Sequence, residues 1–93
     1  MKKLLWFHLN GCPYCIRGEQ AYEELKKENP EYAKIEVQYV EEDEHPEISS
    51  QYDYQANPAL FLDGTLKYQA HVGESYESMK ENFRKVLDEA LNG

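Results

Sequence analysis

Cys12 and Cys15 are the only cysteines in the chain, and they stand three residues apart in the stretch GCPYC. Residues three apart on a helix have Cβ atoms about 5–6 Å apart, close to the about 3.5–4.5 Å that a disulfide requires, so the pair can close and reopen. A permanent crosslink gains most when it closes a long loop, and this loop is short. The spacing therefore favours redox catalysis or metal binding over a structural crosslink.

The pair lies where an expected strand meets an expected helix. Residues 4–9 (LLWFHL) are a continuous apolar run, typical of a buried parallel strand, and residues 13–29 carry the three-to-four spacing of an amphipathic helix. Cys12 then occupies or adjoins the helix N-cap, where unpaired backbone N–H groups and the helix dipole favour its thiolate. Pro13 suits the first helical turn because it has no N–H to leave unsatisfied. We expect Cys12 to attack a substrate disulfide and the more buried Cys15 to resolve the mixed disulfide.

The rest of the chain repeats strand and helix patterns. The stretch AKIEVQYV alternates apolar and polar residues, and Pro46 suits the first turn of a short helix. The pair Asp63-Gly64 predicts a hairpin turn, and Ser75 predicts the N-cap of a final helix. These patterns predict strands at residues 33–40, 59–62 and 66–72, and helices at residues 46–50 and 76–91.

This order of elements predicts one α/β domain over residues 1–93. A right-handed crossover makes the first two strands parallel neighbours, and the hairpin adds two antiparallel strands. The predicted fold is a four-stranded mixed sheet flanked by three helices.

Composition excludes several classes of partner. The formal net charge of -8 argues against nucleic acid and anionic membranes, because such binding needs clustered Lys and Arg. No stretch approaches the about 18–20 apolar residues of a membrane span, and the start of the chain lacks a secretory signal pattern. We expect a cytoplasmic protein that acts as a monomer.

A zinc site and a permanent disulfide are the structural alternatives for the cysteine pair. A closed zinc site needs four ligands, and the three histidines, His8, His45 and His71, are far apart in the predicted fold. We therefore expect no metal. His8 ends the first strand four residues before Cys12, and we interpret it as a framework residue rather than a catalytic one.

The stretch GCPYC followed by Ile16-Arg17 resembles the active site of dithiol glutaredoxins, which belong to the thioredoxin superfamily. The resemblance covers nearly the whole chain and implies a thioredoxin-like fold with Cys12 and Cys15 as the catalytic pair. It also implies that the Asn57-Pro58 peptide bond is cis and that the main chain of Asn57 pairs with substrate or glutathione.

The resemblance places Pro13, Tyr14, Asn57 and Pro58 in the substrate-binding site. Tyr14 stands beside the reactive sulfur, so it is expected either to contact substrate or to serve the framework. Thioredoxins carry a buried carboxylate six residues before the first cysteine, and this chain has Trp6 there. Water is then the default acceptor of the Cys15 proton.

The predicted function is reduction of protein disulfides, or of mixed disulfides with glutathione, through a reversible Cys12–Cys15 disulfide. No tightly bound cofactor is expected, because the electrons come from the dithiol, and glutathione or a reductase regenerates it. The alternative is a module that holds an iron–sulfur cluster through Cys12 and glutathione. Glutaredoxins grip glutathione with a glycine pair, which is reduced here to Gly73-Glu74-Ser75, so the sequence favours the oxidoreductase. A redox-inactive interaction domain is a further alternative. The presence of both cysteines argues against it.

Overall fold

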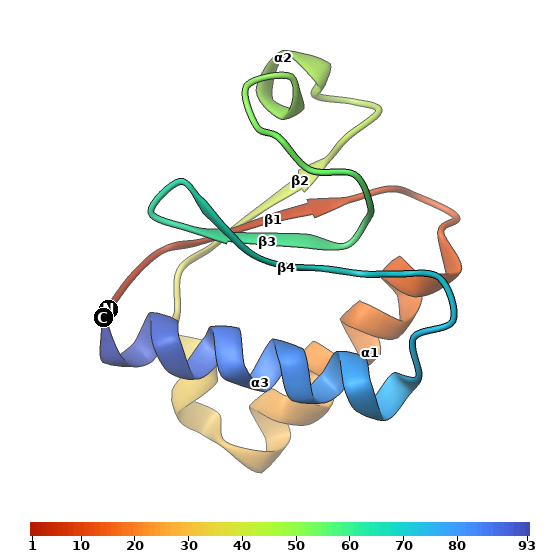
Figure 1. Ribbon diagram of the computed structural model, residues 1–93. Coiled ribbons are helices and arrows are strands. Elements are labelled where there is room, and N and C mark those ends of the chain that lie inside the picture. The colour runs from red at the N-terminus through yellow and green to blue at the C-terminus, as the bar shows by residue number, and fades with distance from the viewer.

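Strand β1 (Leu4–His8) occupies the interior of a four-stranded mixed sheet in the computed structural model, which describes residues 1–93 (Figure 1). It pairs in parallel with β2 (Val37–Glu41) and antiparallel with β3 (Ala59–Leu62). Strand β3 pairs antiparallel with β4 (Thr65–Gln69), which gives the strand order β2-β1-β3-β4. All five residues of β1 are buried, because strands flank it on both sides and side chains cover both faces. The predicted mixed sheet with three α-helices is confirmed.

Helices α1 (Pro13–Glu28) and α3 (Tyr76–Asn92) lie together against one face of the sheet, and the short helix α2 (Pro46–Ser49) lies on the other side (Figure 1). The alternation along β1 divides the core accordingly. Leu4 and Trp6 join the larger cluster beneath α1 and α3, and Leu5 and Phe7 join the smaller cluster on the opposite face. None of the helices is long and apolar enough to cross a membrane.

The expected strand at residues 33–40 begins later than predicted. Residues Pro30–Lys34 form a 3-10 helix, η1, whose start is fixed when the Asn29 side chain accepts a hydrogen bond from the backbone N–H of Glu31 at 3.2 Å. Ile35 ends this helix and is 4% exposed, so its apolar side chain fills the core without being part of β2. The alternation of apolar and polar residues at the start of the predicted strand therefore arises from the packing of η1. Pairing with β1 begins only at Val37.

The second hairpin strand ends at Gln69 and not at residue 72. Its partner β3 begins only at Ala59, directly after Pro58, so the pairing stops soon afterwards. The last contact is a hydrogen bond from the Ala70 backbone N–H to the Pro58 carbonyl at 3.1 Å. Residues 70–75 are thereby free to turn from the sheet toward α3.

Candidate redox site

Cys12 is the N-cap of α1, as the sequence predicts. Gly11 turns the chain out of β1 with a φ of +80°, a conformation that favours glycine, and Cys12 is extended with φ -80° and ψ 120°. Pro13 begins the helix, and the N–H of Ile16 donates to the Cys12 carbonyl at 3.1 Å. The Cys12 side chain is half-buried. Its sulfur thus stands at the positive end of a 16-residue helix and within reach of solvent.

Cys15 lies one turn inside α1 and is fully buried. Its Sγ accepts a hydrogen bond from the backbone N–H of Leu9 at 3.5 Å. Burial raises the pKa of the Cys15 thiol to about 12, and a hydrogen bond with Cys12 and the charges of Cys12 and Glu19 act in the same direction. The Leu9 hydrogen bond acts against this shift. Cys15 is therefore a protonated thiol at neutral pH, and it needs a proton acceptor before it can attack a disulfide.

The Asn57–Pro58 peptide bond is cis, as the family resemblance implied. The Cys12 thiol lies 3.9 Å from the Asn57 carbonyl oxygen, within the range of a weak S–H···O hydrogen bond. The Asn57 side chain is held by a different partner, because its Nδ2 donates a hydrogen bond to Glu42 Oε1 at 3.1 Å. The fold thus brings the cysteine motif and the loop before β3 to one place, with the Asn57 main chain facing Cys12.

A groove of about 450 Å³ runs beside this loop, between residues 55–57, residues 69–72 and the ring of Tyr14. Tyr14 is fixed in place: its hydroxyl accepts a hydrogen bond from the Gly73 N–H at 2.7 Å, and the Arg17 guanidinium lies 5.0 Å from its ring centre. Val72, at 93% exposure, presents an apolar side chain at the edge of the groove. The ring of Tyr14 therefore both lines the groove and ties α1 to the loop that precedes α3.

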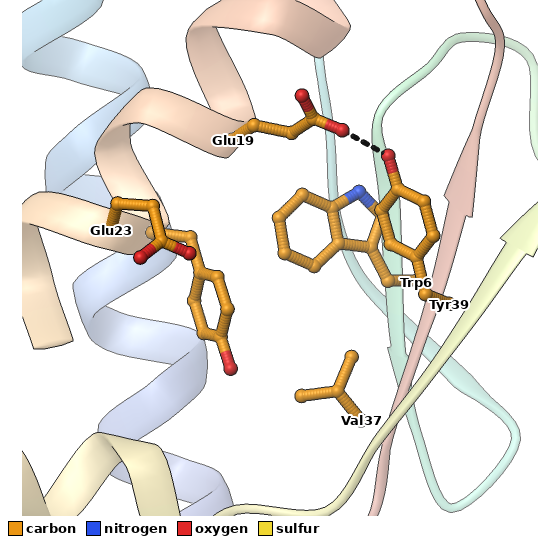
Figure 2. Close-up of a pocket in the computed structure, with 6 residues that line it drawn as sticks. Trp6, Glu19, Glu23, Val37 and Tyr39 are labelled. Atoms are coloured by element: carbon orange, nitrogen blue, oxygen red, sulfur yellow. Dashed lines mark hydrogen bonds between the residues drawn. The ribbon is translucent and has the colours of Figure 1, made fainter.

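Three polar side chains that the sequence does not mark as site residues form a cluster whose charges act on Cys15 or are acted on by it. Glu19, one turn further along α1, accepts a hydrogen bond from the Tyr39 hydroxyl on β2 (Figure 2). Nδ1 of His8 on β1 lies 3.8 Å from Glu19 Oε1, and the rings of His8 and Tyr39 are 4.9 Å apart. One feature of the sequence could have indicated that Glu19 lies at the site. It follows Cys15 by four residues, a spacing that places both side chains on one face of the helix.

The donor set around the cysteines does not form a zinc site within one chain. His45 pairs with Glu47, and His71 pairs with Glu74. No group of three or more His, Cys, Asp or Glu side chains is arranged to hold a metal ion.

A family model described as a thioredoxin domain matches residues 7–89, which include both cysteines and the cis proline. Among solved structures, a malarial protein is 18% identical with a TM-score of 0.62, and the match covers 91% of this chain and 96% of that one. Human ERp44 in a zinc-bound form is 22% identical with a TM-score of 0.59 over 92% of this chain, and this chain spans only 27% of ERp44. Sequence comparison with curated proteins gives no match. At these identities the structural likeness supports the fold alone.

Proposed function

The chain belongs to the thioredoxin domain family, and from this premise we propose that it is a thiol–disulfide oxidoreductase acting through Cys12 and Cys15. One observation carries the proposal: an accessible sulfur at a helix N-terminus has a second, fully buried sulfur one turn behind it. The two cysteines therefore have different tasks. Cys12 reacts with the substrate disulfide first. Cys15 is shielded from solvent and reacts only after the mixed disulfide has formed.

The reaction proceeds in two exchanges. The Cys12 thiolate attacks one sulfur of a substrate disulfide, forms a mixed disulfide with it and releases the other sulfur as a thiolate. Cys15 then loses its proton and attacks the Cys12 sulfur, which closes the Cys12–Cys15 disulfide and releases the second substrate sulfur. The substrate gains two electrons and the protein loses two. A thiol reductant, glutathione or a reductase, restores the dithiol.

The groove beside Tyr14 is the proposed binding site for the polypeptide chain of the substrate. A segment lying there in extended form passes the main chain of Asn57, whose carbonyl faces Cys12. Pro13 and Pro58 stiffen the two loops that meet at the sulfur, so the site is largely formed before substrate arrives. Val72 at the groove and Ile16, directly after Cys15, are both exposed and offer apolar contacts to a substrate.

More specifically, we propose that the protein acts as a glutaredoxin. The residues Pro13 and Tyr14 between the two cysteines support this assignment. A glutaredoxin-type pair has a reduction potential of about -200 to -230 mV, and a thioredoxin-type pair about -270 mV. Glutathione would then be both a substrate component and the reductant. Action in the cytoplasm as a monomer, on protein disulfides, is part of the same proposal.

The decisive experiment is to oxidise the protein and to measure which donor reduces the Cys12–Cys15 disulfide again. Glutathione with glutathione reductase, and a thioredoxin reductase with NADPH, are the two donors. Rapid turnover with the first supports the glutaredoxin form, and rapid turnover with the second supports the thioredoxin form. A protein that neither donor reduces, although its disulfide forms, would contradict the proposed catalytic cycle. A variant with Cys12→Ser provides the background rate.

A further inference from the structure

Glu19 sits at the centre of a small polar cluster behind the buried cysteine. Its Oε1 atom accepts a hydrogen bond from the Tyr39 hydroxyl and lies 3.8 Å from His8 Nδ1. His8 is in turn held by a hydrogen bond between its Nε2 and Asn10 Oδ1 at 3.1 Å, and its Nδ1 has no hydrogen-bond partner although it is buried. Two side chains on the sheet therefore fix the position of a carboxylate that projects from α1.

The Glu19 and Cys15 side chains project from the same face of α1. Glu19 follows Cys15 by four residues on α1, a spacing at which Cβ atoms are about 5–6 Å apart. The Leu9 N–H holds the Cys15 Sγ at the carboxyl end of β1, next to His8. The Cys15 side chain is fully buried, whereas the Glu19 side chain is 48% exposed. Glu19 is therefore a half-exposed carboxylate one helical turn from a buried thiol.

We propose that Glu19 is the acceptor of the Cys15 proton in the resolving step, and that His8 and Tyr39 are positioning residues that hold its carboxylate. The inference rests on the proposed function of the cysteine pair. The proton leaves Cys15 Sγ and ends on the Glu19 carboxylate, either directly or over one water. The Cys15 electron pair forms the bond to Cys12 Sγ, and the substrate sulfur leaves as a thiolate. Glu19 then returns its proton to solvent from its exposed side. His8, interpreted from the sequence as a framework residue, acquires this positioning role.

Electrostatics support this assignment. The negative charge of Glu19 helps to raise the pKa of the Cys15 thiol, which shows that the two groups lie near enough to interact. The other charged or titratable groups around the pair come from three elements. They are Cys12, Tyr22 and Glu23 on α1, His8 on β1, and Tyr39 and Glu41 on β2.

The test separates the two exchanges with the aryl disulfide dithiobis(nitrobenzoate), which releases a coloured thiolate in each. In stopped-flow measurements the first release reports attack by Cys12, and the second reports attack by Cys15 on the mixed disulfide. In Glu19→Gln we expect an unchanged first release and a second release about 10- to 100-fold slower at neutral pH. General-base catalysis contributes about 10²- to 10⁴-fold, and access of water to this half-exposed site reduces the loss. Glu19→Asp, which keeps a carboxylate, should recover part of the rate.

Glu23→Gln is the matched control, because it makes the same charge change one turn further along α1 on the same hollow of about 430 Å³ (Figure 2). It should leave both releases unchanged. A role of Glu19 through charge alone gives the opposite result: removing the charge lowers the Cys15 pKa, so the second release becomes faster. A faster or unchanged second release in Glu19→Gln overturns the inference. Absence of the first release in the wild-type protein would instead count against the proposed function itself.

Discussion

The Sγ atom of Cys12 lies 3.9 Å from the main-chain carbonyl oxygen of Asn57, a residue 45 positions away in the sequence. This contact joins the start of α1 to the loop that leads into β3 through a cis proline. The reacting sulfur and the main chain expected to pair with a peptide thus occupy one site. A disulfide bound along the loop would meet Cys12 before it could reach the buried Cys15.

The different roles of Cys12 and Cys15 can be tested by trapping the mixed disulfide between the protein and its substrate. In Cys15→Ser the first exchange proceeds and the second cannot, so a stable mixed disulfide between Cys12 and the substrate should accumulate. In Cys12→Ser no mixed disulfide should form, and reduction should fall to the uncatalysed background, because Cys15 is fully buried. Mass spectrometry of the protein after reaction with oxidised glutathione reads out both variants. Equal labelling of the two variants would contradict the assigned order of attack.

The protonation of Cys15 gives a second prediction. Its pKa is raised to about 12, chiefly by burial, with a smaller contribution from the neighbouring Cys12. In Cys12→Ser that contribution is lost, so the Cys15 pKa should lie below about 12 but still above the ordinary value for a thiol. Ultraviolet absorbance of the thiolate during a pH titration measures it. Subtracting the double variant with Cys15→Ser removes the signal of the tyrosines. A midpoint at the ordinary value would show that Cys15 is not desolvated.

Much of this site could be predicted from local sequence. The apolar run before Gly11, the proline after Cys12 and the three-residue spacing to Cys15 are all local signals, and they place the cysteine pair at a helix start. The hairpin turn at Asp63-Gly64 is equally local, since Asp63 and Gly64 both adopt positive φ.

What the sequence did not reveal depends on contacts between distant segments. Nothing near Glu19 in the chain indicates that β2 would bring Tyr39 to its carboxylate. The alternating stretch at residues 33–36 carried the pattern of a strand, but Pro30 and the Asn29 side chain start a 3-10 helix there. Contacts between distant segments determine both the Glu19–Tyr39 hydrogen bond and the late start of β2. No periodic pattern in the sequence indicates either of them.

Gly18 illustrates such a distant contact and gives a third prediction. A Cβ atom at this position would lie 3.1 Å from both the Phe83 ring and the Pro58 ring, so α1 approaches α3 and the cis-proline loop closely here. Gly18→Ala gains about 1 kcal/mol of helix propensity, but crowding in a packed core costs about 1–3 kcal/mol. Because Phe83 and Pro58 are fully buried, we expect net destabilisation and slower attack by Cys12.

Urea unfolding and the first release in the aryl disulfide assay measure the two effects of Gly18→Ala. Ala21 on the same helix is fully buried, and Ala21→Gly serves as the comparison because it disturbs the core without pushing on Pro58. It should lower stability and leave the rate of Cys12 attack unchanged. Higher stability of Gly18→Ala, together with an unaltered rate, would refute the close-packing argument.

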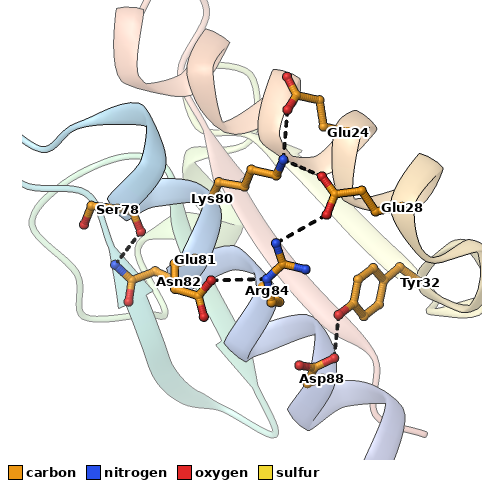
Figure 3. Close-up of polar contacts among 9 residues, drawn as sticks. All are labelled: Glu24, Glu28, Tyr32, Ser78, Lys80, Glu81, Asn82, Arg84 and Asp88. Atoms are coloured by element: carbon orange, nitrogen blue, oxygen red, sulfur yellow. Dashed lines mark hydrogen bonds and ion pairs between the residues drawn. The ribbon is translucent and has the colours of Figure 1, made fainter.

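An ion-pair cluster between α1 and α3 gives a fourth prediction. Lys80 contacts Glu24 at 3.0 Å and Glu28 at 2.5 Å, and Arg84 contacts Glu28 at 3.3 Å (Figure 3). Glu24 and Glu28 are exposed, and Lys80 and Arg84 are partly exposed, so solvent and salt weaken the attraction between them. Lys80→Met should lower the melting temperature slightly at low ionic strength, and the difference should shrink as salt is added. Lys85→Met on the same helix, for which no ion pair is found, is the control. A difference that does not depend on salt would assign the effect to packing.

Glu74 carries the most buried carboxylate of the chain and gives the last prediction. It is 3% exposed at the start of α3, and its oxygens accept hydrogen bonds from Tyr68 Oη at 2.5 Å and from Ser78 Oγ and Asn82 Nδ2 at 3.1 Å each. Tyr68→Phe removes one donor from a buried charge, which costs about 1.5–3 kcal/mol.

Tyr52→Phe is the control for this change. The Tyr52 hydroxyl makes no hydrogen bond, although its ring packs against Phe7 and Phe61, so its loss should change stability by less than about 0.5 kcal/mol. Urea unfolding measures both variants. The Tyr68 change should also loosen residues 70–75, which hold Tyr14 through the Gly73 N–H, and so raise hydrogen exchange at that amide. Equal effects of the two substitutions would mean that the Glu74 carboxylate obtains its stabilisation from its other partners, Ser78, Asn82 and His71.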